Sequence, residues 1–419
     1  MNGLTMPPLR TRSLLLVLLS VGLLYYSSDR LPLSSNFRGL KIAPDSHRHH
    51  DDAGSISTAA VARAGEVLLV SAFFPLNESR HSDREYEKFL GTFLGSIQSP
   101  IHFFTPPEIA PLVRRKRGSL PITINSSYAD PFDVPPVQGL YHYYDKMRRW
   151  QNKDRETEGP GLYALRTAKP WFLTEAVKNY ERELASGSQS IRYAFWVDVG
   201  SFYDGLKVRG WPNVERVESA FREGAETTGR SEGELIFFPM NDVPNPTMQW
   251  WKEDMGPLSR NFAQTSFFGG TPNAIEWWKR VYLKYHDYWL FNREAFVGQD
   301  ETMFNSLSLL FPGRIITVWP RDPHAPAALG DKADPLGVCG NLRWYFRYFF
   351  ASRTERRRLG AFFKSRVWRM PWQIFSPVEE CRLTRVLGME DVLRRNFGAK
   401  WDPPKAELDL NADYRPKPQ

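Results

Sequence analysis

The sequence has only two cysteines, no internal repeat, no cluster of zinc ligands and no recognisable nucleophile motif. The last two absences disfavour a hydrolase that works through zinc or through an activated serine or cysteine. Cys339 and Cys381 allow one disulfide in an oxidising compartment, and the alternative is two unrelated buried thiols. With 42% hydrophobic and 14% aromatic residues, the chain can form a large core, which excludes a disordered protein.

One segment accounts for the whole excess of positive over negative charge in this 419-residue chain, whose formal net charge is +8. Residues 343–369 contain nine Lys and Arg side chains and a single acidic residue, Glu355. Aromatic residues are interleaved with these cations, which fits packing beneath arginine stems, an anionic membrane surface or substrate, or nucleic acid. We favour packing, and the lumenal location predicted below argues against nucleic acid.

The amino end contains an apolar segment, residues 13–28, which follows Arg10 and Arg12 and is dominated by Leu and Val. A cleaved signal peptide needs small residues at alternate positions before the cut, and Tyr26 occupies one of them. We therefore expect an uncleaved signal-anchor helix, with residues 1–12 in the cytoplasm and the body in the lumen. A cleaved signal and a soluble intracellular protein are the alternatives.

Two further features agree with a body in the lumen. Residues 29–64 are rich in Ser, Asp, His and Ala without an apolar period, which predicts a flexible stem. Asn77 and Asn125 begin sequons that permit N-glycosylation.

From residue 65 onwards, short apolar runs alternate with segments in which apolar residues recur at helical spacing. Strands are predicted at 66–74, 101–104, 122–124, 193–197, 234–239, 263–268 and 314–318, and helices at 86–97, 169–185, 214–221, 273–288 and 302–310. This alternation is typical of a doubly wound, mostly parallel α/β sheet, here at 65–330. A surface excursion at 130–168, a basic aromatic helical extension at 331–400 and a loose tail at 401–419 complete the prediction.

Polar residues adjoin three of these segments. They are Asp198 with Gly200 after the 193–197 strand, Gly269–Gly270 after the 263–268 strand, and Gln299–Asp300 before the last helix. We expect the first two sets at one rim of the sheet and the third facing them from a loop. The alternatives are an ordinary turn at Gly269–Gly270 and a helix-capping role for Asp300.

Such a rim suits a nucleotide-diphosphate sugar. Asp198 has the oxygen ligands that Mg²⁺ or Mn²⁺ prefers, and the glycines allow a sugar ring or phosphate to approach the backbone. Asp300 is placed to orient or deprotonate an acceptor hydroxyl.

An ordered set of motifs resembles the HtrL/YibB-type family and, more distantly, the glycosyltransferases of GT-A fold. The motifs are Val70-Ser71-Ala72-Phe73-Phe74, Lys169-Pro170, Phe195-Trp196-Val197-Asp198-Val199-Gly200, Phe267-Phe268-Gly269-Gly270-Thr271 and Gly298-Gln299-Asp300. The resemblance covers roughly residues 66–320. It implies a GT-A-like domain with the donor near Phe73, Lys169, Asp198 and Gly200, and the acceptor near Gly269, Gly270, Gln299 and Asp300.

The sequence departs from that fold's usual metal motif. Transferases of this type have two carboxylates that flank one residue, whereas here only Asp198 matches and Gly200 stands at the third position. Asp204 is a candidate second carboxylate, and Lys169 with Arg80 and Arg84 are candidates to replace the metal.

The resulting prediction is a single-pass type II membrane protein of the Golgi or another secretory compartment. It transfers a sugar from a nucleotide-sugar donor to a glycan or glycoprotein acceptor, with Asp198 and Asp300 as catalytic residues and Mn²⁺ or Mg²⁺ as an optional cofactor held by Asp198. The alternative is a catalytically inactive lumenal binding or scaffold protein, which the missing second carboxylate favours.

Overall fold

The computed structural model describes residues 66–76, 82–149, 159–184, 190–259, 262–367 and 378–416. The predicted cytoplasmic tail, anchor and stem, together with Asn77 and Arg80, lie outside these residues. Within the described ranges, no helix is both long and apolar enough to cross a membrane.

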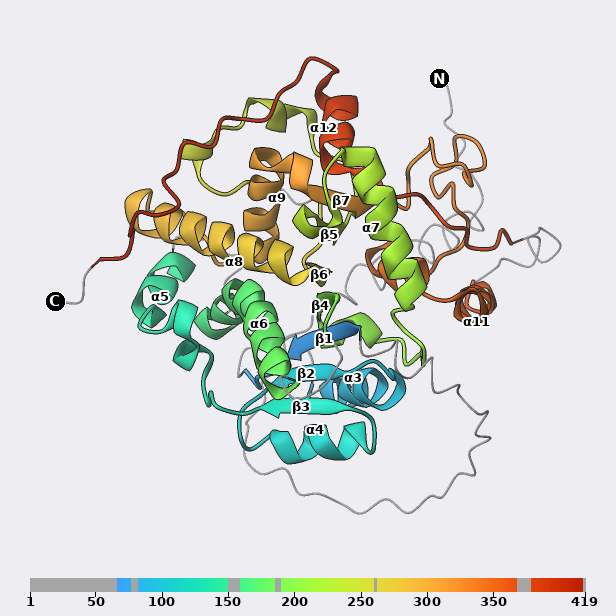
Figure 1. The fold of residues 1–419 in the computed structure, drawn as a ribbon, viewed down its shortest axis with the longest axis horizontal. Helices are drawn as coiled ribbons and strands as arrows, with labels where there is room; N and C mark the ends of the chain where they lie inside the picture. Colours follow the sequence, from blue (N-terminus) through green and yellow to red (C-terminus); the bar gives the residue numbers. More distant parts are fainter. Residues whose placement is uncertain are drawn as a thin grey trace, which may run out of the picture. The chain divides into compact units, whose positions relative to one another are not determined.

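The described strands form one eight-stranded sheet in the order β3-β2-β1-β4-β6-β5-β7-β8 (Figure 1). Strand β6 is antiparallel to both of its neighbours and β8 is antiparallel to β7, while all other pairs are parallel. The sheet is therefore mixed but mostly parallel, as the alternating pattern predicts. The strands are β1 (Val67–Ala72), β2 (Ile101–Phe104), β3 (Ile122–Asn125), β4 (Tyr193–Val197), β5 (Ile236–Pro239), β6 (Phe267–Gly270), β7 (Ile315–Val318) and β8 (Leu387–Gly388).

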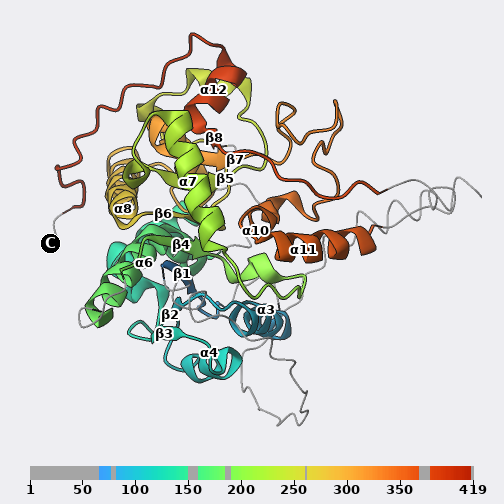
Figure 2. The ribbon, with the colours of Figure 1, turned by 45° about the vertical axis from the view of Figure 1, so that its right-hand side comes forward.

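Helices cover both faces of the sheet. Figures 1 and 2 show α6 and α8 on one side and α3, α10 and α11 on the other. The helices are α3 (Asp83–Ser96), α4 (Ala110–Arg117), α5 (Tyr141–Arg149), α6 (Pro160–Leu184), α7 (Val214–Thr228), α8 (Pro272–Asp287), α9 (Asp300–Leu310), α10 (Tyr345–Phe349), α11 (Arg353–Ser365) and α12 (Met389–Phe397).

Strand β4 lies between the two hydrophobic cores. Because successive side chains of a strand point to opposite faces, Ala194 and Trp196 belong to the core under α6 and α8. Phe195 and Val197 belong to the core under α3, α7 and α10. Burial on both faces explains why this strand reads as an uninterrupted apolar run.

Several helix boundaries follow local sequence signals. Ser82 and Glu85 form a capping box at the start of α3. Thr271 accepts a hydrogen bond from the backbone N–H of Ala274, and Pro272 is the first residue of α8, as predicted.

The predicted surface excursion at 130–168 is wrong in two places, since α5 lies within it and α6 begins at Pro160. Pro170 consequently lies inside α6 rather than at its start. The apolar face of the longer helix, which includes Tyr163, Ala164 and Ala168, is buried in the core. That burial offsets the roughly 3 kcal/mol that an internal proline costs.

The carboxyl-terminal part packs against the sheet domain. The aromatic residues of α10 are buried in the second core, and a disulfide joins Cys339 to Cys381. The predicted loose tail contains no helix or strand in the residues described up to 416, and it passes the carboxyl-terminal end of α8 towards α5 (Figure 1). Arg415 holds it there by ion-pairing with Asp287, with Nε 2.8 Å from Oδ2, and by donating to the carbonyl of Pro136.

Candidate active site at the carboxyl edge of strand β4

Three segments that are distant in the sequence meet at the ammonium group of Lys169. Lys169 lies within α6, Asp198 follows β4 directly, and Asp300 is the first residue of α9. The Nζ atom is 3.1 Å from Asp198 Oδ2 and 2.7 Å from Asp300 Oδ2. The structure thus brings together two predicted carboxylates through a lysine that the prediction placed on the donor side.

Further donors hold the two carboxylates. The indole Nε1 of Trp196 donates to Asp198 Oδ1 at 2.6 Å. The backbone N–H of Glu301 donates to Asp300 Oδ1 at 3.1 Å, and Arg166 Nε lies 3.9 Å from the same oxygen. Arg166 reaches the site because it precedes Lys169 by three residues, which places both cations on one face of α6.

The charges in this cluster stabilise one another. Burial alone would raise the pKa of Asp300, but Lys169 and Arg166 outweigh burial and hold that pKa below its ordinary value. Burial alone would lower the pKa of Lys169, but Asp198 and Asp300 outweigh it and raise that pKa. Both groups are therefore ionised at neutral pH. Asp300 is consequently suited to orienting a hydroxyl rather than to accepting its proton.

Glu301 differs from its neighbour. Burial, reinforced by the charge of Asp300, raises the pKa of the Glu301 carboxyl. A carboxyl with a raised pKa is a better proton acceptor at neutral pH than one whose pKa is lowered. The sequence analysis missed both Glu301 and Arg166. Their proximity to Asp300 and Lys169 along the chain is the signal that would have indicated them.

Gly200 borders open space. A Cβ atom at this position would meet no atom within 4 Å, and its backbone is not left-handed. Neither packing nor backbone conformation requires glycine here. The side chain of Asp198, two residues earlier in the chain, is 35% exposed, so a ligand can reach this carboxylate.

Gly269 and Gly270 do not share the edge that Asp198 occupies. The register pairs Gly270 with Ala194 and Phe267 with Val197, so the glycines lie near the opposite end of β4. The expectation of a common rim is wrong because β6 runs antiparallel to β4. A Cβ on Gly269 would lie 2.0 Å from the carbonyl oxygen of Ala194, so close strand approach explains this glycine.

The residues that β6 brings to Asp198 come before the strand. The backbone N–H of Asp198 donates to the carbonyl of Ser266 at 2.8 Å. The carbonyl of Thr265 accepts from Lys169 at 3.4 Å. Predicting that Thr265 and Ser266 lie beside Asp198 requires the direction of β6, and the apolar pattern of the strand does not reveal that direction.

Gln299 contributes a polar atom to the acceptor side. Its Oε1 atom is buried, and it has no hydrogen-bond partner among the residues that the structure describes. The residue caps α9 without a side-chain capping bond. Because buried polar atoms are normally paired, this oxygen is available to accept a hydrogen bond from a substrate hydroxyl or amide.

The remaining predicted site residues have local partners. Phe73 directly follows β1 and packs on Tyr86 of α3, with ring centroids 5.2 Å apart. Asn125 ends β3, and its side chain accepts from the backbone N–H of Ser127 at 3.0 Å. Its glycosylation stays a prediction.

A divalent metal does not fit the carboxylates at this edge. Both oxygens of Asp198 and Oδ1 of Asp300 accept hydrogen bonds from protein donors, and Oδ2 of Asp300 is in ion-pair contact with Lys169. Asp204, the candidate second carboxylate, is paired with Arg347 through both oxygens. Across the described part of the chain, no group of three or more His, Cys, Asp or Glu residues is arranged to hold a metal ion.

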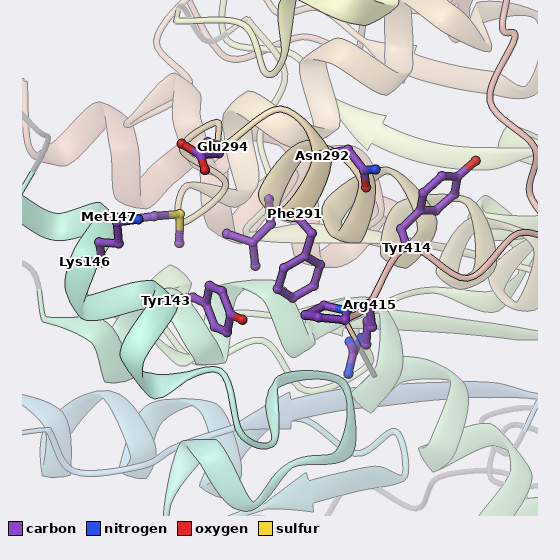
Figure 3. Close-up of a pocket in the computed structure, with 10 residues that line it drawn as sticks. Tyr143, Lys146, Met147, Phe291, Asn292, Glu294, Tyr414 and Arg415 are labelled. Carbon is purple, nitrogen blue, oxygen red and sulfur yellow. The ribbon is translucent and has the colours of Figure 1, made fainter. Parts of the chain in front are cut away.

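A separate cavity of about 280 Å³ lies between α5, the turn after α8 and the carboxyl-terminal tail (Figure 3). None of Lys169, Asp198 and Asp300 lines it. This cavity is therefore distinct from the lysine-centred site. It is lined by Tyr143, Lys146, Met147, Leu290, Phe291, Asn292, Glu294, Tyr414, Arg415 and Pro416.

No protein-family model matches the chain, and no curated protein sequence matches it. Among solved structures, the apo crystal structure of mouse xyloside xylosyltransferase 1 is similar, with a TM-score of 0.34 and 11% sequence identity. That match covers 67% of this chain and 93% of the other. A likeness this weak carries no functional argument, so membership of the HtrL/YibB-type family stays a prediction.

Proposed function

We propose that the protein is a glycosyltransferase that moves a sugar from a nucleotide-sugar donor to a hydroxyl of a glycan or glycoprotein. The observation that carries the proposal is the meeting of Asp198 and Asp300 at Lys169, beside the open space at Gly200. We further propose that the domain lies in the lumen of the Golgi or another secretory compartment, anchored by residues 13–28. The disulfide between Cys339 and Cys381 supports an oxidising compartment.

The sheet topology supports a nucleotide ligand at this edge. The chain proceeds from β1 outwards to β2 and β3, and then crosses back to place β4 on the other side of β1. In open α/β sheets, ligands bind at such a switch point, beyond the carboxyl ends of the two strands. Asp198 directly follows β4 and Phe73 directly follows β1, and these two strands are paired, which supports the proposal that the donor binds there.

The transfer itself assigns different roles to the polar residues. The oxygen of the acceptor hydroxyl forms a bond to the anomeric carbon, and the bond from that carbon to the phosphate oxygen breaks. The nucleoside diphosphate leaves with the electron pair, and the hydroxyl proton passes to a base. Asp198 faces the donor, Asp300 and Gln299 orient the acceptor, and Glu301 is the residue whose pKa best suits it to take the proton.

Substitution of the two carboxylates tests the proposal. With a panel of nucleotide sugars and glycan acceptors, we expect Asp198→Asn and Asp300→Asn each to lower kcat/KM on the order of 100-fold. Asp331→Asn, at an exposed position, serves as the matched control. Circular dichroism verifies that each variant is folded. Parental turnover in folded Asp198→Asn would refute the role of that residue.

The alternative is a lumenal binding or scaffold protein without catalysis. The contacts that protein groups already make with both carboxylates favour it. A thermal-shift screen with nucleotide sugars separates the two, because a ligand that binds the folded state raises the melting temperature. Stabilisation by one nucleotide series supports the transferase, and no stabilisation across the panel supports the scaffold.

A further inference from the structure

We infer that the ammonium of Lys169 takes the place of a divalent cation at this site, so that sugar transfer proceeds without Mn²⁺ or Mg²⁺. The inference rests on the proposed function as far as transfer is concerned. Its structural part, that Lys169 occupies the cation position between Asp198 and Asp300, stands on the geometry alone.

The first argument is the position of the ammonium. Lys169 Nζ bridges carboxylates from two different elements, at 3.1 Å to Asp198 and 2.7 Å to Asp300. A metal ion held by the same two residues would need the oxygens that the ammonium already contacts. The other oxygen of each carboxylate accepts from Trp196 or from the backbone N–H of Glu301. No carboxylate oxygen of the pair is left facing only solvent.

The second argument is charge balance. Asp198 and Asp300 contribute two negative charges, and Lys169 with Arg166 contributes two positive ones. An ionised Glu301 adds one negative charge, which Arg343 opposes. A divalent cation added to this neutral cluster would leave an uncompensated charge of +2 beside a buried lysine. Burying unpaired charge is strongly unfavourable, so the cluster as built offers no electrostatic attraction to a metal.

The third argument is that the lysine is held firmly. Its side chain is only 9% exposed. The ammonium lies 3.4 Å from the carbonyl of Thr265 and 5.7 Å from the centroid of the Trp196 ring, within the range of a cation–π contact. Because Lys169 projects from the interior of α6, its backbone cannot swing away to admit an ion.

Gly200 supplies a direct test of the inference. It stands two residues after Asp198, where a second carboxylate would complete a metal motif, and a Cβ atom there would meet no atom within 4 Å. Replacement of Lys169 by Gln removes the resident cation and keeps a side chain of similar reach. The double variant Lys169→Gln/Gly200→Asp therefore recreates two metal-binding carboxylates without a competing ammonium.

Mn²⁺ binding to the ligand-free full chain is measured by electron paramagnetic resonance and by isothermal titration calorimetry. We expect the wild type to show no saturable site tighter than about 1 mM, and the double variant to bind at least about 10-fold more tightly. Lys169→Arg/Gly200→Asp, which keeps a cation, is the matched control and should not gain the site. Saturable binding by the wild type below that threshold, or no gain in the folded double variant, overturns the inference.

A second comparison tests the added carboxylate while Lys169 is kept. Gly200→Asp alone changes only a position with open space, and it should bind Mn²⁺ no better than the wild type while Lys169 is present. A gain in this single variant also overturns the inference.

Nucleotide binding by the wild type is then titrated in EDTA and in Mn²⁺, with equal affinities expected. Absence of any nucleotide binding would refute the proposed function, while the Mn²⁺ measurements still decide the role of Lys169.

Discussion

Arg347 and Asp204 form a buried ion pair in which both carboxylate oxygens accept from the guanidinium, at 2.9 and 3.2 Å. Arg347 Nη1 also donates to the carbonyl of Ser201 at 2.8 Å, and the guanidinium lies over the ring of Phe202. The pair ties the turn after β4 to α10 in the basic segment. At this position the excess positive charge of residues 343–369 serves the fold, in agreement with the packing interpretation.

Loss of this pair should destabilise the protein strongly. We expect Arg347→Ala to lower the free energy of unfolding by about 3–5 kcal/mol, because it leaves the Asp204 carboxylate buried without its partner. Urea denaturation measures the change. Arg357→Ala, at an exposed position of the same basic segment, should change stability by less than about 0.5 kcal/mol. Equal effects of the two substitutions would contradict a structural role for the ion pair.

Two glycines of the predicted site should respond in opposite ways to alanine. In Gly269→Ala the new methyl group would overlap the backbone of β4, so we expect a loss of about 3 kcal/mol or more, or no soluble protein. In Gly200→Ala the methyl group enters open space, and stability should stay within about 0.5 kcal/mol of the wild type. Thermal unfolding of both variants provides the comparison. A tolerated Gly269→Ala would show that the strands are not as close as described.

Local signals predicted much of the fold. The buried run before Asp198, the cap at Thr271 and the helical period of α8 each depend on neighbouring residues, so the sequence contains them directly. The direction of β6 cannot be predicted in this way, because a short apolar strand has the same sequence pattern in either orientation. That single ambiguity misplaced Gly269 and Gly270.

Long-range pairing explains the remaining misses. The docking of the tail depends on Arg415 meeting Asp287, and the site depends on Lys169 meeting Asp300. Neither pair has a sequence signature, since each partner alone is an ordinary charged residue on a helix or loop. Asp198 was predictable because a polar residue at the end of a buried strand is itself a local pattern.

The disulfide should make a large contribution to stability. Cys339 and Cys381 are separated by 42 residues, and closing a loop of that size restricts the unfolded chain by about 2–4 kcal/mol. We expect Cys339→Ser and Cys381→Ser to lower stability equally, and a reductant to lower wild-type stability to the same level. Under reducing conditions the serine variants should show no further loss. Unequal effects of the two substitutions would indicate that the thiols act separately.

The lowered pKa of Asp300 makes stability depend on pH at the acidic end. Because Lys169 and Arg166 favour the ionised carboxyl in the folded state, its contribution is present above the ordinary pKa of 3.8 and is lost as the pH falls through the folded value. Asp300→Asn should therefore be less stable than the wild type at neutral pH, and the difference should shrink on acidification. Urea denaturation across this range gives the comparison, and a pH-independent difference would contradict the ion pair.

Glu301 should show the opposite sign. Burial and the charge of Asp300 raise its pKa, so the folded state disfavours ionisation. Its favourable contribution is present below the ordinary pKa of 4.5 and is lost as the pH rises through the raised value. Glu301→Gln should thus be more stable than the wild type at neutral pH, and this gain should disappear towards pH 4.

The same substitution should lower kcat on the order of 100-fold if Glu301 takes the acceptor proton. It should also abolish the acidic limb of the rate profile. A gain in stability with unchanged kcat would show that Glu301 is a buried acid beside the site and would refute its role as the base.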